Sequence, residues 1–108
     1  MQETSVEKVK NLLEHHKGEE NAITAKSIAF ICNLPDSNGN PNVRAIIRFI
    51  IEEYSLPIAA SPKGFFLISN DEEYAKYMNN LNDRITGIEK RKTALVKSYN
   101  TYFGADSA

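Results

Sequence analysis

Few side chains of this chain have the type and spacing that catalysis or metal binding requires. His15 and His16 are adjacent, so on a helix they point in different directions and lack the four-residue spacing by which two histidines share a metal. Cys32 is the single cysteine, which excludes an internal disulfide and fits a small buried side chain in a reducing compartment. No Ser-His-Asp set stands in a plausible context, and no glycine-rich phosphate loop occurs. We therefore expect no enzyme, no cofactor and no bound metal.

An acidic run, Asp71 to Glu73, offers carboxylates for a metal site or for acid-base chemistry. The same run opens a long helical segment, where acidic side chains in the first turn interact favourably with the helix dipole. That structural role is sufficient to explain the run.

Arginines and asparagines form a second set with a different chemistry. Arg44 and Arg48 are four residues apart, and Asn40 and Asn42 precede them. Arg side chains suit bidentate contacts with guanine edges, and Asn side chains suit adenine edges. Alternatively, the arginines belong to the solvated face of an amphipathic helix, with Arg48 paired to Glu52 four residues further on. The two arginines alone do not decide between these interpretations.

The elements that precede this set are predicted from caps and periodicity. Thr4 opens a capping box before a helix from about Ser5 to His16, in which apolar residues recur at helical spacing. A short strand is expected at 21–23. Thr24 then suits the N-cap of a short second helix, Ala25 to Cys32.

Asn40 and Pro41 predict the start of a third helix, because Asn is a preferred N-cap and Pro suits the first helical position. The helix should run to Tyr54. Its predicted apolar face consists of Val43, Ile46, Ile47, Ile50, Ile51 and Tyr54. The opposite face carries Arg44, Ala45, Arg48 and Glu52.

Two short apolar runs within 56–69 predict a β-hairpin. Pro62 suits the second position of a type I turn, and Gly64 suits the left-handed position after it, which makes a three-residue connection. Lys63 is then expected at the tip of the hairpin.

A long helix is predicted from Asp71 to about Asn100, after a second capping pattern at 69–72. Nine residues along it follow alternating steps of four and three and form a heptad seam, apolar at all but Lys92. The seam consists of Tyr74, Met78, Leu81, Ile85, Ile88, Lys92, Leu95, Tyr99 and Tyr102. A helix of about 45 Å exceeds what a domain of this size needs for its own core, so we expect pairing with a second chain.

Composition sets the broad class. The chain has 108 residues, 42% of them hydrophobic and 25% charged, which suits one soluble globular domain. A net charge of -1 argues against nucleic-acid binding through bulk positive charge, so any such binding must come from local placement of charge. No apolar run approaches the ~18 residues of a membrane span, and no leader is evident, so we expect a cytoplasmic protein without membrane contact.

The order of these elements resembles the winged helix-turn-helix domains of bacterial and phage regulators, of the type that opens the biotin-operon repressor. The resemblance covers about Ile23 to Ile68. It rests on Ile23-Thr24-Ala25-Lys26-Ser27-Ile28-Ala29, on Val43-Arg44-Ala45-Ile46-Ile47-Arg48, and on Leu56-Pro57-Ile58 followed by Lys63-Gly64-Phe65-Phe66-Leu67. Small phage proteins with a similar wing and one long helix resemble the whole chain.

The seam predicts a long C-terminal helix at 71–103 as a dimerisation element that can form a coiled coil, and residues 104–108 are expected to be a disordered tail. The resemblance implies an α+β, mostly α fold with a winged-helix domain at 1–70. It also implies that the third helix lies in the major groove of double-stranded DNA while the hairpin touches the backbone or the minor groove. The implied DNA contacts are Lys26, Ser27, Asn40, Asn42, Arg44, Ala45, Arg48 and Lys63. The expected homodimer contacts are Met78, Leu81, Ile85, Ile88, Leu95 and Tyr99.

The expected function is therefore that of a dimeric DNA-binding regulator of transcription or replication in a bacterium or phage. The near-neutral charge leaves a rival open. In that alternative, the winged-helix scaffold holds protein partners through the long helix and the apolar hairpin, without DNA binding.

Overall fold

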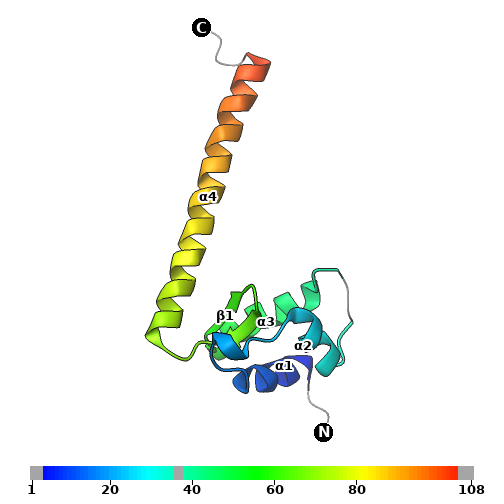
Figure 1. Cartoon of the computed structure of the whole chain (residues 1–108). Coiled ribbons are helices and arrows are strands. Elements are labelled where there is room, and N and C mark those ends of the chain that lie inside the picture. Colours follow the sequence, from blue (N-terminus) through cyan, green and yellow to red (C-terminus); the bar gives the residue numbers. More distant parts are fainter. Residues whose placement is uncertain (1–3, 36–37, 105–108) are drawn as a thin grey trace. The chain divides into compact units, whose positions relative to one another are not determined.

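A computed structural model describes residues 4–35 and 38–104 of the chain. The elements are α1 (Ser5–Glu14), the 3-10 turn η1 (Glu19–Asn21), α2 (Ala25–Ile31), α3 (Pro41–Tyr54), β1 (Ile58–Ser61), β2 (Gly64–Leu67) and α4 (Asp71–Phe103) (Figure 1). The chain forms two compact units, one ending at Tyr74 and the other beginning at Ala75. The mostly helical α+β class is confirmed.

The core of the first unit is built where α1, α2 and α3 pack together, with the hairpin beside them (Figure 1). The core residues are Val9, Leu13, Ile23, Ile28, Ala29, Cys32, Val43, Ile47, Ile50 and Ile58. Phe65 and Leu67 pack against this cluster from alternate positions of β2. Cys32 is buried, as predicted.

Two predicted helix caps are confirmed. The Thr4 hydroxyl accepts a hydrogen bond from the backbone N–H of Glu7 at 3.1 Å. The Thr24 hydroxyl likewise accepts from the N–H of Ser27 at 3.1 Å. Both helices end slightly earlier than predicted, at Glu14 and Ile31, with His15 and Cys32 as their C-caps.

Asn40 precedes α3 but does not cap it with its side chain. Its backbone is left-handed, with φ 46° and ψ 60°, and the side chain makes no cap hydrogen bond. An N-cap side chain reaches the helix when its own backbone is extended, which this conformation prevents. The predicted position is therefore right and the predicted capping hydrogen bond is wrong.

The apolar face of α3 is narrower than predicted. Val43, Ile47 and Ile50 are buried, whereas Ile51 is 39% and Tyr54 is 48% exposed. Ile51 lies one residue past Ile50, about 100° around the helix and so at the edge of the buried stripe. Tyr54 is the last helical residue, and its ring lies at the surface with the Lys10 ammonium 5.7 Å from its centroid.

The hairpin is antiparallel, with Ile58 opposite Leu67 and Ser61 opposite Gly64. Only Pro62 and Lys63 separate the last paired residues, so the connection has two residues where three were predicted. Gly64 keeps the expected positive φ, here 127°, as the first residue of β2.

Two single-residue bridges extend the hairpin on its β2 edge: Lys17 pairs with Leu67, and Ile23 pairs with Phe65. Ile23 and Phe65 exchange two backbone hydrogen bonds of 2.8 Å. The predicted strand at 21–23 is thus wrong for Asn21, which belongs to η1, while Ile23 does pair as a strand residue. This pairing fixes the start of α2 beside β2.

Gly64 cannot carry a side chain without moving this junction. A Cβ there would overlap the Ile23 carbonyl oxygen and lie 2.8 Å from the backbone nitrogen of Thr24. We expect Gly64→Ala to lower the free energy of unfolding by about 2–4 kcal/mol, through this clash and the positive φ. Gly87→Ala in α4, with no atom within 4 Å, should instead stabilise the helix by about 1 kcal/mol. Urea denaturation measures both, and an unchanged midpoint for Gly64→Ala would contradict the contact.

The start of α4 is joined to the first unit by Glu73. Its carboxylate accepts from the backbone N–H and the hydroxyl of Ser69, both at 2.8 Å, and from the N–H of Glu19 at 2.8 Å. The Asn70 side chain accepts from the N–H of Glu73 at 2.9 Å. The capping pattern therefore lies one residue later than predicted, with Asn70 and Glu73 in place of Ser69 and Glu72, and Glu73 also contacts Glu19, 54 positions away.

Replacing Glu73 by Gln puts an amide where the carboxylate accepts three hydrogen bonds. We expect Glu73→Gln to lower the free energy of unfolding by about 1–2 kcal/mol. Glu72→Gln is the matched control, because Glu72 is exposed in the same helical turn, and its effect should stay within about 0.5 kcal/mol. Equal thermal midpoints for the two variants would show that the Glu73 contacts do not support the fold.

Helix α4 has 33 residues, and none of its side chains is buried. It ends at Phe103, three residues beyond the end at about Asn100 that caps and periodicity predicted, and Gly104 follows with φ 66°, the left-handed conformation that commonly closes a helix. Of the predicted disordered tail, residues 105–108 lie outside the described residues. Among the described helices, none is both long and apolar enough to cross a membrane.

Candidate functional site

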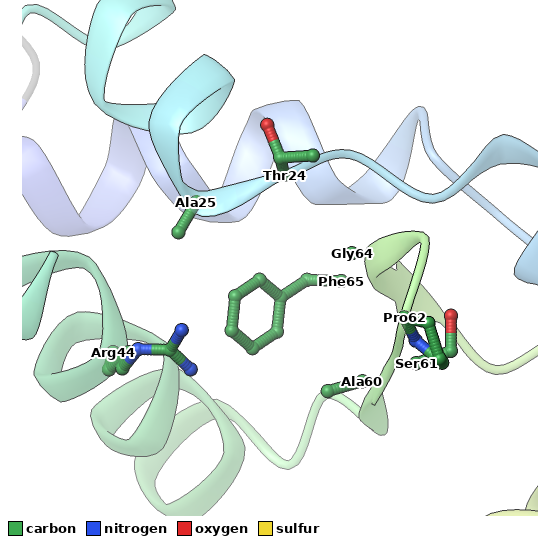
Figure 2. Close-up of a pocket in the computed structure, with 8 residues that line it drawn as sticks. All are labelled: Thr24, Ala25, Arg44, Ala60, Ser61, Pro62, Gly64 and Phe65. Atoms are coloured by element: carbon green, nitrogen blue, oxygen red, sulfur yellow. The ribbon is translucent and has the colours of Figure 1, made fainter. Parts of the chain in front are cut away.

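A pocket of about 220 Å³ lies where the start of α2, the first turns of α3 and the hairpin turn meet (Figure 2). Its lining consists of Thr24, Ala25, Arg44, Ala60, Ser61, Pro62, Gly64 and Phe65. Arg44 is the only charged residue of this lining. The pocket exists because Gly64 lets the backbone of β2 approach the Ile23–Thr24 segment closely.

Arg44 is held by two contacts from different elements. Its Nε donates a hydrogen bond to the Gly39 carbonyl oxygen at 2.7 Å. Its guanidinium carbon lies 5.6 Å from the centroid of the Phe65 ring, and Figure 2 shows the guanidinium pointing toward that ring. A guanidinium over an aromatic face is attracted by the ring quadrupole. The side chain is exposed yet oriented by β2 and by the loop before α3.

Other cations follow the pocket lining directly in the sequence. Lys26 comes after Ala25, and Lys63 comes after Pro62 at the hairpin tip; both are exposed. Arg48 lies one turn beyond Arg44 on α3, at the distance of about 6 Å that separates such helical neighbours. Four positive side chains predicted as DNA contacts therefore come from the elements around one pocket.

The remaining predicted contacts differ in exposure. Ser27, Asn42 and Ala45 are exposed in the first turns of α2 and α3. Asn40 is buried, with 9% of its surface exposed, and its Oδ1 accepts no hydrogen bond among the described residues. In this conformation Asn40 shapes the entry to α3 and does not present its amide to a ligand.

The acidic start of α4 lies past the end of β2 that is far from this pocket. Glu73 contacts Ser69 and Glu19 just past Leu67, the last residue of β2. The pocket lies at the other end of β2, beside Gly64. Four strand residues rise by about 10 Å, which is comparable with the Debye length of about 8 Å at physiological ionic strength. The acidic start of α4 is thus screened from Arg44 and Lys63.

The alternative pairing of Arg48 is not observed. Glu52 stands four residues after it, and both side chains are exposed, yet no ion pair joins them. Arg48 therefore offers its charge to solvent.

Helix α4 presents the second candidate surface, the heptad seam. The predicted dimer contacts on it are Met78 (38% exposed), Leu81 (partly buried), Ile85 (54%), Ile88 (58%), Leu95 (69%) and Tyr99 (60%). Val96 and Phe103 widen the apolar face at its C-terminal end, where the rings of Tyr99 and Phe103 lie 4.8 Å apart. A contiguous apolar row of this length marks an interaction surface.

The histidines have local structural contacts. His15 Nδ1 lies 2.8 Å from the Asn11 carbonyl oxygen, and His16 Nδ1 lies 2.7 Å from that of Asn21. Within the part of the chain that the structure describes, no three His, Cys, Asp or Glu side chains gather as a metal site would require.

Comparison of the chain with models of known protein families, with curated proteins and with solved structures finds no match.

Sequence reasoning did not find Phe65 and Gly39 as partners of Arg44. The charge pattern on α3 singled out Arg44, but its neighbours come from a strand 21 residues later and from a loop carbonyl that any residue supplies. The sequence did contain one signal for an aromatic partner. Phe65 and Phe66 follow Gly64, and successive strand residues point to opposite faces, so each face of β2 carries one ring.

The two arginines should differ in their effect on stability. We expect Arg44→Ala to lower the free energy of unfolding by about 1–2 kcal/mol, the sum of one hydrogen bond and one exposed cation-π contact. Arg48→Ala, which removes the same side chain one turn away without such contacts, should stay within about 0.5 kcal/mol. Urea unfolding curves measure the difference, and equal curves would mean that Phe65 and Gly39 do not hold Arg44.

Proposed function

We propose that this chain is a cytoplasmic winged-helix protein that binds double-stranded DNA and regulates transcription or replication in a bacterium or phage. The observation that carries the proposal is a pocket between α2, α3 and the hairpin turn that Arg44 lines, with exposed Lys26, Arg48 and Lys63 on the same elements. Most non-specific affinity for DNA comes from neutralised phosphates, so this local charge matters more than the net charge of -1.

The order of elements supports the same proposal. Winged-helix domains place a recognition helix in the major groove and a β-hairpin against the adjacent backbone. Here α3 follows α2, and the hairpin follows α3 and pairs with Ile23 before α2. Helix α3 and the hairpin tip therefore flank the same pocket, as a groove-reading helix and its wing must.

Each cation has a role in this mechanism. Arg48 and Asn42 are exposed on α3 and have no partner to displace within the described residues, so they suit base edges. Lys63 and Lys26 suit phosphates on either side of the groove. Arg44, already oriented by Phe65, loses little side-chain entropy on binding, which favours it as the central contact.

Self-association through α4 completes the proposal. None of its side chains is buried, although it carries a row of large apolar residues. Most helical stability in proteins comes from packing an amphipathic face. A second copy of the chain, presenting the same seam, supplies that packing.

A rival function is favoured by a different observation. Phe30 is 86% and Ile31 56% exposed at the end of α2, at the opposite end of that helix from the pocket. Exposed apolar side chains of this size suit a protein partner. In this rival the first unit is a protein-binding scaffold without useful affinity for DNA.

Fluorescence anisotropy of a labelled random duplex across a salt series separates the two functions. The proposal predicts binding whose logarithm falls linearly with the logarithm of salt concentration. Lys26→Ala with Lys63→Ala should weaken binding and reduce the magnitude of the slope by about 1–2, since each lost phosphate contact removes about 0.9.

Lys8→Ala is the control for loss of a positive charge away from the pocket. Lys8 is an exposed lysine of α1 beside Ile31 and Cys32, at the far end of α2 from the pocket, so its removal should leave the slope unchanged. Absent binding at low salt, or an equal slope change for Lys8→Ala, would overturn the DNA-binding proposal and favour the protein scaffold.

A further inference from the structure

We infer that two copies of α4 pair as a parallel, in-register, two-stranded coiled coil, held in register by Arg84, Glu89 and Lys92. The inference rests on the self-association proposed above and deepens it, because it fixes direction, register and the number of chains. It is argued from the heptad positions of charged residues and from the exposure of the seam.

The seam assigns each residue of α4 to a heptad position. In the usual lettering, Met78, Ile85, Lys92 and Tyr99 occupy a positions, and Tyr74, Leu81, Ile88, Leu95 and Tyr102 occupy d positions. These positions repeat over about four heptads, which is the length that typifies a coiled coil. The partly exposed a and d side chains are then covered by the partner helix as knobs in holes.

The flanking charges favour a parallel pair. Arg84 occupies a g position and Glu89 the e position five residues later, both exposed. In a parallel in-register pair, each g residue meets the e residue five positions further along the partner. Arg84 of one chain then meets Glu89 of the other, and the two-fold symmetry forms this ion pair twice.

An antiparallel pair opposes like charges. There the g positions of one helix face the g positions of the other, and Arg84 and Arg91 both occupy g. Two antiparallel registers give the greatest overlap of the two seams. In one of them Arg84 of each chain faces Arg91 of the other chain, and in the second Arg91 of one chain faces Arg91 of the other. Such arrangements lose the attraction to Glu89 and add repulsion.

Lys92 limits the assembly to two chains. It is the one charged residue of the seam, at an a position, and its charge must reach water. At the edge of a two-stranded core its long side chain reaches solvent, whereas larger bundles enclose the a position more fully. A single lysine at a thus specifies register and oligomeric state at some cost in stability.

The full-length protein tests these points in two steps. Sedimentation equilibrium should give the mass of a dimer. Tyr102→Cys should then form an intermolecular disulfide in high yield under mild oxidation, because a parallel pair brings both copies of this d position into one layer. An antiparallel pair separates them by roughly 40 Å. Wild-type protein, with only the buried Cys32, is the control for unrelated cross-linking.

Charge reversal tests the ion pair independently. Arg84→Glu should raise the dimer dissociation constant roughly fivefold or more, because two attractive contacts become repulsive. The double variant Arg84→Glu with Glu89→Arg should restore wild-type association. Lys90→Glu, a reversal at the outward f position of the same helix, should leave it unchanged.

Different outcomes test the parallel register and the self-association of α4. A monomer at the highest soluble concentration would overturn the proposed self-association and with it the coiled coil. A dimer in which the Tyr102→Cys variant forms no intermolecular disulfide, or a double variant no better than Arg84→Glu, would overturn the parallel register while leaving self-association in place. A trimer mass would overturn the role assigned to Lys92.

Discussion

The close approach of β2 to the Ile23–Thr24 backbone is the constraint on which the first unit depends. Without a side chain at Gly64, Ile23 and Phe65 exchange their two backbone hydrogen bonds, and this pairing places the start of α2 against the hairpin. Phe65 is thereby held beneath Arg44, and Lys63 stands at the turn beside the pocket. One missing methyl group thus sets the geometry of every element around the candidate site.

Local signals in the sequence were enough to predict the elements but not the contacts between distant ones. Thr4 and Thr24 cap helices where expected, because capping depends on residues three positions apart. Asn40 was mispredicted, because its left-handed backbone and burial follow from how the chain enters the core. The same limit applies to Arg44. The sequence predicted that Arg44 carries an exposed charge on α3, but it did not predict the contact with the Phe65 ring.

The pattern of charge explains how a chain with a net charge of -1 can offer a cationic surface. The carboxylate of Glu73 is occupied by the Ser69 and Glu19 N–H groups just past the end of β2. The Glu73 carboxylate therefore stabilises the start of α4. At its distance from the pocket, salt weakens its electrostatic interaction with Arg44. Glu73 thus lies past the end of β2 while Arg44 lies beside Phe65 near its start, so the net charge alone does not describe the charge near the pocket.

The two proposals constrain one another through symmetry. A parallel in-register pair has its two-fold axis along the coil, and both α4 helices begin at the same end. In the proposed dimer, the first units of the two chains are therefore related by that axis. A DNA target with the same two-fold symmetry has inverted half-sites. An antiparallel pair would begin the helices about 40 Å or more apart, farther than the 34–36 Å of one DNA turn. In the proposed dimer, the contact between Arg84 and Glu89 sets the direction of α4, and this direction decides which arrangement of DNA sites such a dimer would suit.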